Sequence, residues 1–173
     1  LEMSKPPEGV IQAVYLLSDN QKLPLINSLI ADNPDYHSIL IFSSTKKKVI
    51  EIVRGLRSKN YLVEGISSDL EQKEREAMLV RFKSRKTRVL VATDVLSRGI
   101  DIKDINLVIN FDAPSDAEDY VHRVGRTARA ETTGVAVTLV NRADMPKIQR
   151  IEKLIGTRIY NAPLPAFIAE NHD

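Results

Sequence analysis

The chain has 173 residues, a length that suits one domain with its own hydrophobic core. It contains no cysteine, which excludes a disulfide scaffold, a thiol nucleophile and a thiolate metal site. The formal net charge is only +2, so any contact with nucleic acid must come from a local basic patch. No apolar run reaches the length of a membrane span and no signal peptide is recognisable, so we expect a cytoplasmic protein without a membrane partner.

Short apolar runs alternate with helical patterns along the chain. Strands are expected over residues 10–16, 38–42, 61–66, 87–92, 106–111 and 134–140. The first helix is expected to begin at Asp19 or Asn20. Four more helices are expected, over residues 45–59, 69–83, 115–124 and 142–154. Repeated strand–helix units of this kind predict an α/β fold, a mostly parallel β-sheet with helices on both faces.

The sequence predicts one domain over residues 9–161, flanked by two short segments without a clear pattern. Residues 1–8 are expected to be an N-terminal extension or linker, in which Leu1 and Glu2 precede the first methionine and are interpreted as cloning residues. Residues 162–173 are expected to be a C-terminal tail, since Pro163 and Pro165 interrupt any regular element there.

The segment from His122 to Arg129 contains three arginines within eight residues. On a helix or its terminal turn, positions three apart share a face, so Arg126 and Arg129 can direct two guanidinium groups at one target. A guanidinium is planar, always charged and suited to phosphate oxygens, and in phosphoryl transfer it stabilises the charge that develops on the transferred group. The alternative is a solvated basic helix end, which is the usual fate of a charge cluster.

Polar residues follow four of the expected strands at the point where each strand ends. They are Ser43 to Thr45, Ser67 to Asp69, Thr93 with Asp94, and Asp112 to Pro114. Ligands of open parallel sheets bind outside the carboxyl ends of the strands, so these clusters support a binding site at that edge. Helix capping is the simpler explanation for Thr45, Asp69 and Ser115, because such residues are frequent N-caps.

The residues after the expected strand 87–92 carry further binding chemistry. The Thr93 hydroxyl and Arg98 can bind a sugar–phosphate backbone without reading bases. Gly99 allows a positive φ or a close approach of another backbone, and Asp101 can accept a hydrogen bond from a ribose hydroxyl. A simple turn is the alternative interpretation of Asp101.

Gln72 and Arg75 lie three residues apart at the start of an expected helix. The amino end of a helix that carries these two side chains is suited to binding phosphate. An exposed polar helix face is the alternative interpretation of the same pair.

In their order and spacing, these segments resemble the second RecA-like domain of DEAD-box RNA helicases, which belong to superfamily 2. Residues 40–45 resemble motif IV of that family, and residues 69–75 resemble its Gln-x-x-Arg segment. Residues 87–101 resemble motif V, residues 110–114 the stretch after motif V, and residues 122–129 motif VI. The resemblance runs from about residue 10 to residue 154. His122 matters for the assignment, because DEAH-box and RecQ-like helicases typically carry glutamine at that point.

The resemblance implies a role for each matching residue. Arg126 and Arg129 would be arginine fingers toward the γ-phosphate of ATP, and Asp101 would contact the ATP ribose. Coupling of the nucleotide state to the other domain would fall to His122 and Arg123. The residues that would hold the RNA backbone are Thr45, Gln72, Arg75, Thr93, Arg98 and Gly99. The chain departs from the family pattern at Ser67 and Ser68, where His-Gly is usual, and at Ala128, where glycine is frequent.

Two motifs of a complete helicase are absent from the sequence. No G-x-x-x-x-G-K-[ST] phosphate loop occurs, and no Asp-Glu-Ala-Asp occurs to hold Mg²⁺. In the family both lie on an N-terminal RecA-like domain, so we interpret the chain as the C-terminal half of an ATP-dependent RNA helicase. ATP with Mg²⁺ would be bound mainly by the other half, and we expect no metal ligand here. The chain alone is expected to be monomeric, to have negligible ATPase activity and to bind RNA weakly, without sequence preference.

Three alternatives remain open from the sequence. The chain is a binding module for RNA or protein that has no ATPase partner domain, or it belongs to a superfamily 2 helicase that acts on DNA, or it is a purely structural α/β domain. His122 and the stretch from Asp112 to Pro114 count against the DNA helicase. A structural domain leaves the combination of Arg98, Asp101 and the motif VI arginines unexplained.

Overall fold

A computed structural model describes residues 9–93, 102–127 and 134–170. Its strands are β1 (Val10–Leu16), β2 (Ile39–Phe42), β3 (Val63–Ile66), β4 (Val89–Ala92), β5 (Leu107–Asn110), β6 (Gly134–Val140) and β7 (Tyr160–Asn161). They form one sheet in the order β3-β4-β2-β5-β6-β1-β7, and every pair is parallel. The expected parallel sheet is therefore confirmed.

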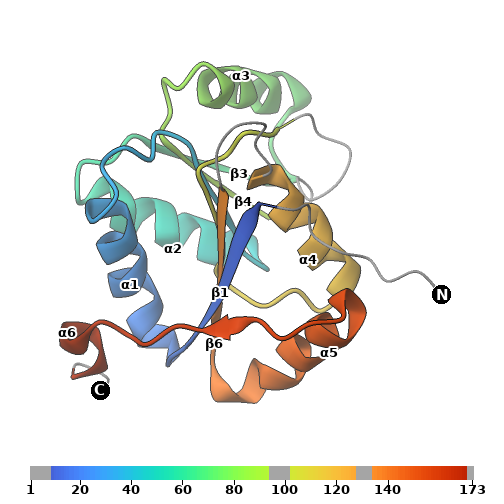
Figure 1. Cartoon of the computed structure of the whole chain (residues 1–173). Helices are drawn as coiled ribbons and strands as arrows, with labels where there is room; N and C mark the ends of the chain where they lie inside the picture. The colour runs from blue at the N-terminus through green and yellow to red at the C-terminus, as the bar shows by residue number, and fades with distance from the viewer. Residues whose placement is uncertain (1–8, 94–101, 128–133, 171–173) are drawn as a thin grey trace.

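Helices follow the strands in turn. They are α1 (Asp19–Ala31), α2 (Lys46–Arg57), α3 (Gln72–Lys83), α4 (Ala117–Val124), α5 (Met145–Ile155) and α6 (Ala166–Ala169), with short 3-10 turns η2 (Gly125–Thr127) and η3 (Arg142–Asp144). In Figure 1 the sheet stands between α1 and α2 on one side and α4 and α5 on the other, with α3 at the top. The helices expected from the sequence begin and end within three residues of those found.

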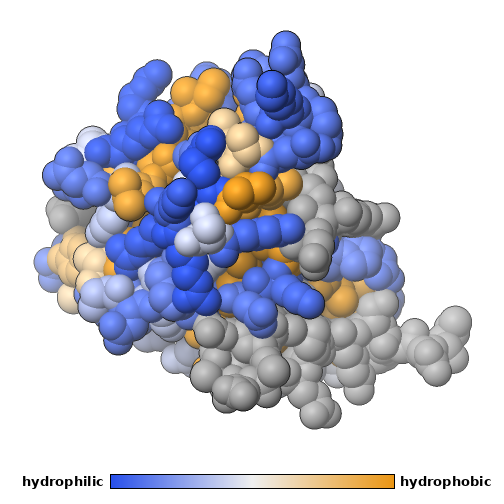
Figure 2. All heavy atoms as spheres, turned by 90° about the horizontal axis from the view of Figure 1, so that it is seen from above, coloured by the Kyte–Doolittle hydropathy of each residue, from blue (hydrophilic) through white to orange (hydrophobic). Residues whose placement is uncertain are grey.

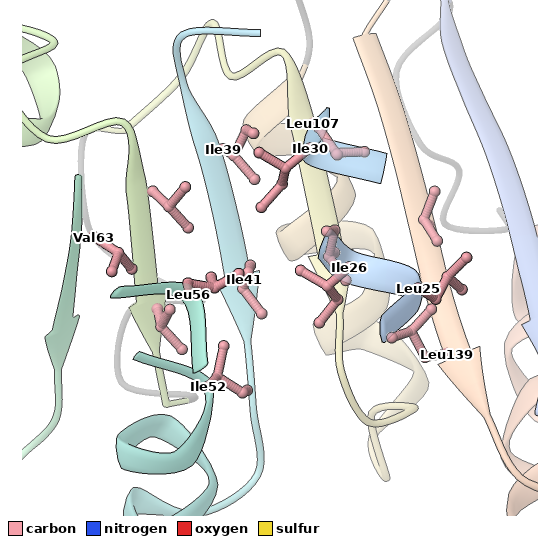
Figure 3. Close-up of a cluster of buried hydrophobic side chains, with 14 of the residues drawn as sticks. Leu25, Ile26, Ile30, Ile39, Ile41, Ile52, Leu56, Val63, Leu107 and Leu139 are labelled. Carbon is pink, nitrogen blue, oxygen red and sulfur yellow. The ribbon is translucent and has the colours of Figure 1, made fainter. Parts of the chain in front are cut away.

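The core lies on both faces of the sheet because successive residues of a strand point to opposite faces. Ile39 and Ile41 of β2 belong to the cluster beneath α1 and α2. Their neighbours Leu40 and Phe42 belong to a second cluster that includes Phe82 of α3. Figure 3 shows the first cluster, with side chains of α1 and α2 pointing toward β2, β5 and β6. All four residues of β2 are fully buried, as a parallel strand covered on both faces requires.

The segment after Asn161, for which we expected only a tail, packs against the domain. The Ala162 amide donates to the Val14 carbonyl at 2.8 Å. Ile168 is only 2% exposed, and its carbonyl accepts a hydrogen bond from the Gln21 side chain at 3.0 Å. Apolar burial holds the segment there, because Ile168 joins the cluster beneath α1 and α2.

Two of the three expected helix caps are wrong. Thr45 caps α2, since its hydroxyl accepts a hydrogen bond from the Lys48 amide at 3.2 Å. Helix α4 is capped by Asp116 rather than Ser115, and α3 begins after Glu71 rather than Asp69. Asp69 instead bonds Ser67 and Lys46 through its side chain. Over the described ranges, no helix is long and apolar enough to cross a bilayer.

Candidate nucleotide and RNA site

Gln72 and Arg75 lie together in the first turn of α3. Arg75 Nη2 donates to Gln72 Oε1 at 2.6 Å, and Gln72 Nε2 donates to Glu76 Oε1 at 3.1 Å. The Nε of Arg75 is buried and has no hydrogen-bond partner within the described ranges. The glutamine therefore fixes the direction of the guanidinium, as a phosphate contact requires.

Thr45 and Thr93 follow β2 and β4, which are neighbours in the sheet. Thr45 is exposed at the amino end of α2. Thr93 is half-buried, and its hydroxyl oxygen has no hydrogen-bond partner among the residues described. Both expected RNA contacts therefore lie at the same edge of the sheet, but only Thr45 is open to solvent.

The residues that follow the motif V segment, Ile102 and Ile105, are bonded to the motif VI segment. The Ile105 amide donates to the Arg126 carbonyl at 3.1 Å, and Thr127 Oγ1 donates to the Ile105 carbonyl at 2.6 Å. In addition, Arg126 Nη1 lies 3.4 Å from the Ile102 carbonyl oxygen. These bonds bring Arg126 to the segment that contains the expected ribose contact. Arg98, Gly99, Asp101 and Arg129 themselves lie outside the described residues.

His122 and Arg123 are neighbours in α4 with opposite environments. His122 is exposed, whereas Arg123 is only 2% exposed. Arg123 Nη1 donates to Asn110 Oδ1 at 3.1 Å, and its guanidinium lies 5.0 Å from the centroid of the Phe42 ring. Burial lowers the pKa of Arg123 to about 10, which leaves the side chain charged at neutral pH. Arg123 thus connects α4 to the ends of β2 and β5.

A buried carboxylate with no individual role assigned from the sequence, Asp112 in the polar cluster after β5, organises the carboxyl edge. Asp112 accepts hydrogen bonds from the Ser44 amide at 3.0 Å, the Ser44 hydroxyl at 2.9 Å and Lys48 Nζ at 2.9 Å. Lys22, only 2% exposed, lies 3.5 Å away and also donates to the Phe111 carbonyl at 2.9 Å. Burial alone would raise the pKa of Asp112, but the bonds from Lys48 and Ser44 and the charge of Lys22 lower it overall.

This network borders a polar pocket of about 230 Å³ between the carboxyl ends of β2 and β5 and the helices α4 and α5. The lining includes Ser44, Lys48, Asp112, Arg123 and Lys147. One feature of the sequence could have indicated the network around Asp112. Lys22 lies one turn before Ile26, which places a lysine on the buried face of α1, where a carboxylate partner is needed. Within the described ranges there is no group of three or more histidine or acidic side chains that could hold a metal ion.

Comparison with known sequences identifies the family. The profile of the family described as "Helicase conserved C-terminal domain" matches residues 21–131. The chain is 40% identical over 134 residues to the ATP-dependent RNA helicase eIF4A of Kluyveromyces lactis, covering 78% of this chain and 33% of that protein. It is 48% identical over 122 residues to the ATP-dependent RNA helicase dbp8 of Emericella nidulans, covering 70% of this chain and 23% of that protein. The chain thus corresponds to a third or less of either relative's length.

Solved structures agree with this assignment. A DEAD box protein from Methanococcus jannaschii superposes with a TM-score of 0.83 at 35% identity, over 90% of this chain and 42% of that chain. Dbp5 of S. cerevisiae bound to RNA and ADP BeF3 superposes with a TM-score of 0.83 at 28% identity, over 91% of this chain and 42% of that chain. The fold is that of RecA-like helicase C-terminal domains, and the chain belongs to the helicase conserved C-terminal domain family in the form found in DEAD-box RNA helicases.

Proposed function

We propose that this domain is one half of an ATP-dependent RNA helicase, and that it works with an N-terminal RecA-like domain to unwind or remodel short RNA duplexes. The observation that carries the proposal is the bonding of Ile105 to Arg126 and Thr127, which holds motif VI against the residues that follow motif V. A purely structural domain has no need to place an arginine of motif VI beside the residues that follow motif V. The relatives are ATP-dependent RNA helicases by name, which supports the same class.

Arg126 fits the γ-phosphate of ATP. Its side chain is half-buried, and the contact of Nη1 with the Ile102 carbonyl restricts its rotamers before a ligand binds. Arg129 would join it at the γ-phosphate, Asp101 would hold the ribose, and Mg²⁺ would be held by the N-terminal domain. When bound, ATP supplies a phosphoryl group whose transfer to water develops negative charge that a positioned guanidinium stabilises.

The RNA backbone would lie along the carboxyl edge, on Thr45, Gln72 and Arg75 together with Thr93, Arg98 and Gly99. Arg75 is directed by Gln72 through a 2.6 Å hydrogen bond, which pre-organises its guanidinium for phosphate. A similar solved structure, Dbp5, is bound to RNA, which supports an RNA ligand for this surface. His122, exposed on α4, is placed to reach the other domain, whereas Arg123 would act from within this one.

The test is RNA-stimulated ATP hydrolysis by the full-length protein that contains this domain. We expect Arg126→Ala to lower turnover by about 1000-fold or more while RNA affinity stays within about twofold, because an arginine finger acts in the transition state. Arg150→Ala, at an exposed position of α5, is the control and should leave turnover unchanged. Unchanged turnover in Arg126→Ala would show that Arg126 is not an arginine finger, and absence of any turnover in the full-length wild type would favour a binding module without an ATPase partner.

A further inference from the structure

A groove of about 460 Å³ runs between α2 and α3 along β3. It is separate from the polar pocket at Asp112, with which it shares no lining residue. The residues that line it are Lys46, Val49, Ile50, Val53, Arg54, Arg57, Gly65, Ser67, Asp69, Leu70 and Met78. The proposed nucleotide site uses none of these residues.

The walls of the groove are apolar on both sides. Val49, Ile50 and Val53 come from α2, while Leu70 and Met78 come from the segment before α3 and from α3 itself. Ile50 is 46% exposed, so its side chain is accessible at the groove. Figure 2, seen from the side of α3, shows hydrophobic patches lying open between hydrophilic ones. An apolar groove of this size accommodates one or two large side chains.

The rim of the groove is cationic. Lys46, Arg54 and Arg57 contribute three positive charges, and the single carboxylate, Asp69, is paired with Lys46. Arg57 donates through Nε to the Val63 carbonyl at 3.2 Å, whereas Arg54 forms no ion pair with any residue in the described ranges. Arg57 lies near the Glu64 carboxylate, so the charge of Arg54 is the one left to select an acidic occupant.

One side of β3 offers main-chain groups to that occupant. Within the described residues β3 is the first strand of the sheet and pairs only with β4. The carbonyls of Leu62 and Ile66 accept hydrogen bonds from β4 and the residues beside it. Because the backbone groups of a parallel strand alternate in direction, those of Val63, Gly65 and Ser67 point the other way. The Val63 carbonyl already accepts from Arg57 Nε at 3.2 Å and the Ser67 carbonyl from the Leu70 amide at 3.3 Å, which leaves the main-chain groups of Gly65 for a partner. A Cβ at Gly65 would lie 2.9 Å from side-chain atoms of Val49 and Val53, so the glycine lets α2 pack closely against β3.

We propose that this groove binds an extended acidic segment of a partner protein, which adds a strand to β3 and places apolar side chains against α2 and α3. Main-chain bonds to Gly65 supply the register, alternate side chains fill the two apolar walls, and carboxylates meet Arg54 and Arg57. RNA is the less suitable occupant, because the walls are aliphatic rather than aromatic and leave bases nothing to stack on.

The test uses the 173-residue chain and a panel of labelled decapeptides that alternate glutamate or aspartate with leucine or phenylalanine. We expect saturable binding that weakens at high salt, and no binding of matched peptides in which serine replaces the apolar residues. Arg54→Glu and Ile50→Glu should each weaken binding by about tenfold or more. An amide N-methylated peptide should lose a similar factor if a strand is added, because it cannot donate to β3.

Two controls match the altered positions in chemistry but lie elsewhere. Leu16→Glu changes a side chain on β1 that is also 46% exposed, and Arg150→Glu reverses an exposed charge on α5; both should leave affinity within about twofold. The proposal is overturned if no peptide of the panel binds, or if Ile50→Glu binds like the wild type. It is also overturned if single-stranded RNA displaces the peptide and Arg54→Glu weakens RNA binding by about tenfold.

Discussion

The guanidinium of Arg123 lies 5.0 Å from the centroid of the Phe42 ring. The same side chain donates to Asn110 Oδ1 at 3.1 Å, and Asn110 Nδ2 donates to Thr138 Oγ1 at 3.1 Å. One residue of motif VI therefore holds together the ends of β2 and β5, and through Asn110 it also reaches β6.

We expect Arg123→Ala to lower the free energy of unfolding by about 2–4 kcal/mol, since it removes a buried cation–π contact and a buried hydrogen bond. Urea unfolding of this chain measures the change. His122→Ala, at the exposed neighbouring position, should change stability by less than about 0.5 kcal/mol. Equal effects of the two substitutions would show that the buried contacts of Arg123 contribute nothing to the fold.

Gly134, at the start of β6, is expected to tolerate no side chain. A Cβ there would lie 2.0 Å from both the carbonyl oxygen and Oγ1 of Thr127, so η2 would have to move. Gly134→Ala should therefore cost about 2–4 kcal/mol and displace the turn that carries Arg126. Gly125→Ala is the matched control, because a Cβ there meets nothing within 4 Å and its φ is −59°. Thermal unfolding of both variants measures the two effects. If Gly134→Ala melts at the wild-type temperature, the expected clash of its Cβ with Thr127 does not occur.

Asp112 is expected to make the free energy of unfolding depend on pH in the acid range. Its folded pKa lies below the ordinary value of 3.8, so its contribution is present above that value and is lost as the pH falls through the folded pKa. Asp112→Asn should cost about 2–3 kcal/mol at pH 7, because Lys22 and Lys48 lose their counter-charge. The difference from the wild type should shrink below about pH 4.

Urea unfolding at several pH values measures this dependence. Asp35→Asn, at an exposed carboxylate, provides the control and should match the wild type at neutral pH. A difference between Asp112→Asn and the wild type that stays constant down to pH 3 would mean that the charge of Asp112 does not stabilise the fold.

Arg75 is expected to contact RNA phosphate. In the full-length protein, Arg75→Ala should weaken single-stranded RNA binding and lower the slope of log affinity against log salt by about 0.7. Gln72→Ala should weaken binding as well, because it releases the guanidinium that the 2.6 Å bond directs. Arg150→Ala, on α5, should leave both affinity and slope unchanged. An unaltered slope in Arg75→Ala would remove this residue from the RNA surface.

The isolated chain is expected to hydrolyse ATP at a negligible rate, with or without RNA, because it contains no phosphate loop to position the nucleotide. A phosphate-release assay on the purified chain measures this directly. Adding the N-terminal domain in the same polypeptide should restore RNA-stimulated turnover. Robust turnover by the isolated chain would show that its own residues form a complete site.

The order of the elements followed from the sequence because each rests on a local pattern. Runs such as residues 39–42 are apolar throughout, as strands covered on both faces must be, and the helices carry apolar residues at helical spacing. The motifs that identified the family are equally local. Gln72 and Arg75 were found because they lie three residues apart in the chain, and Arg126 was found because it lies in the arginine-rich segment 122–129.

The tertiary structure decided which polar residues meet across the sheet. Nothing in the spacing of Lys22, Lys48 and Asp112 shows that they converge, because they come from α1, α2 and the end of β5. The burial of Arg123, the packing of Ile168 and the groove beside β3 likewise depend on contacts between residues far apart in the chain. Periodicity determines which face of an element is buried, but only the three-dimensional arrangement of the elements determines which side chains that face contacts.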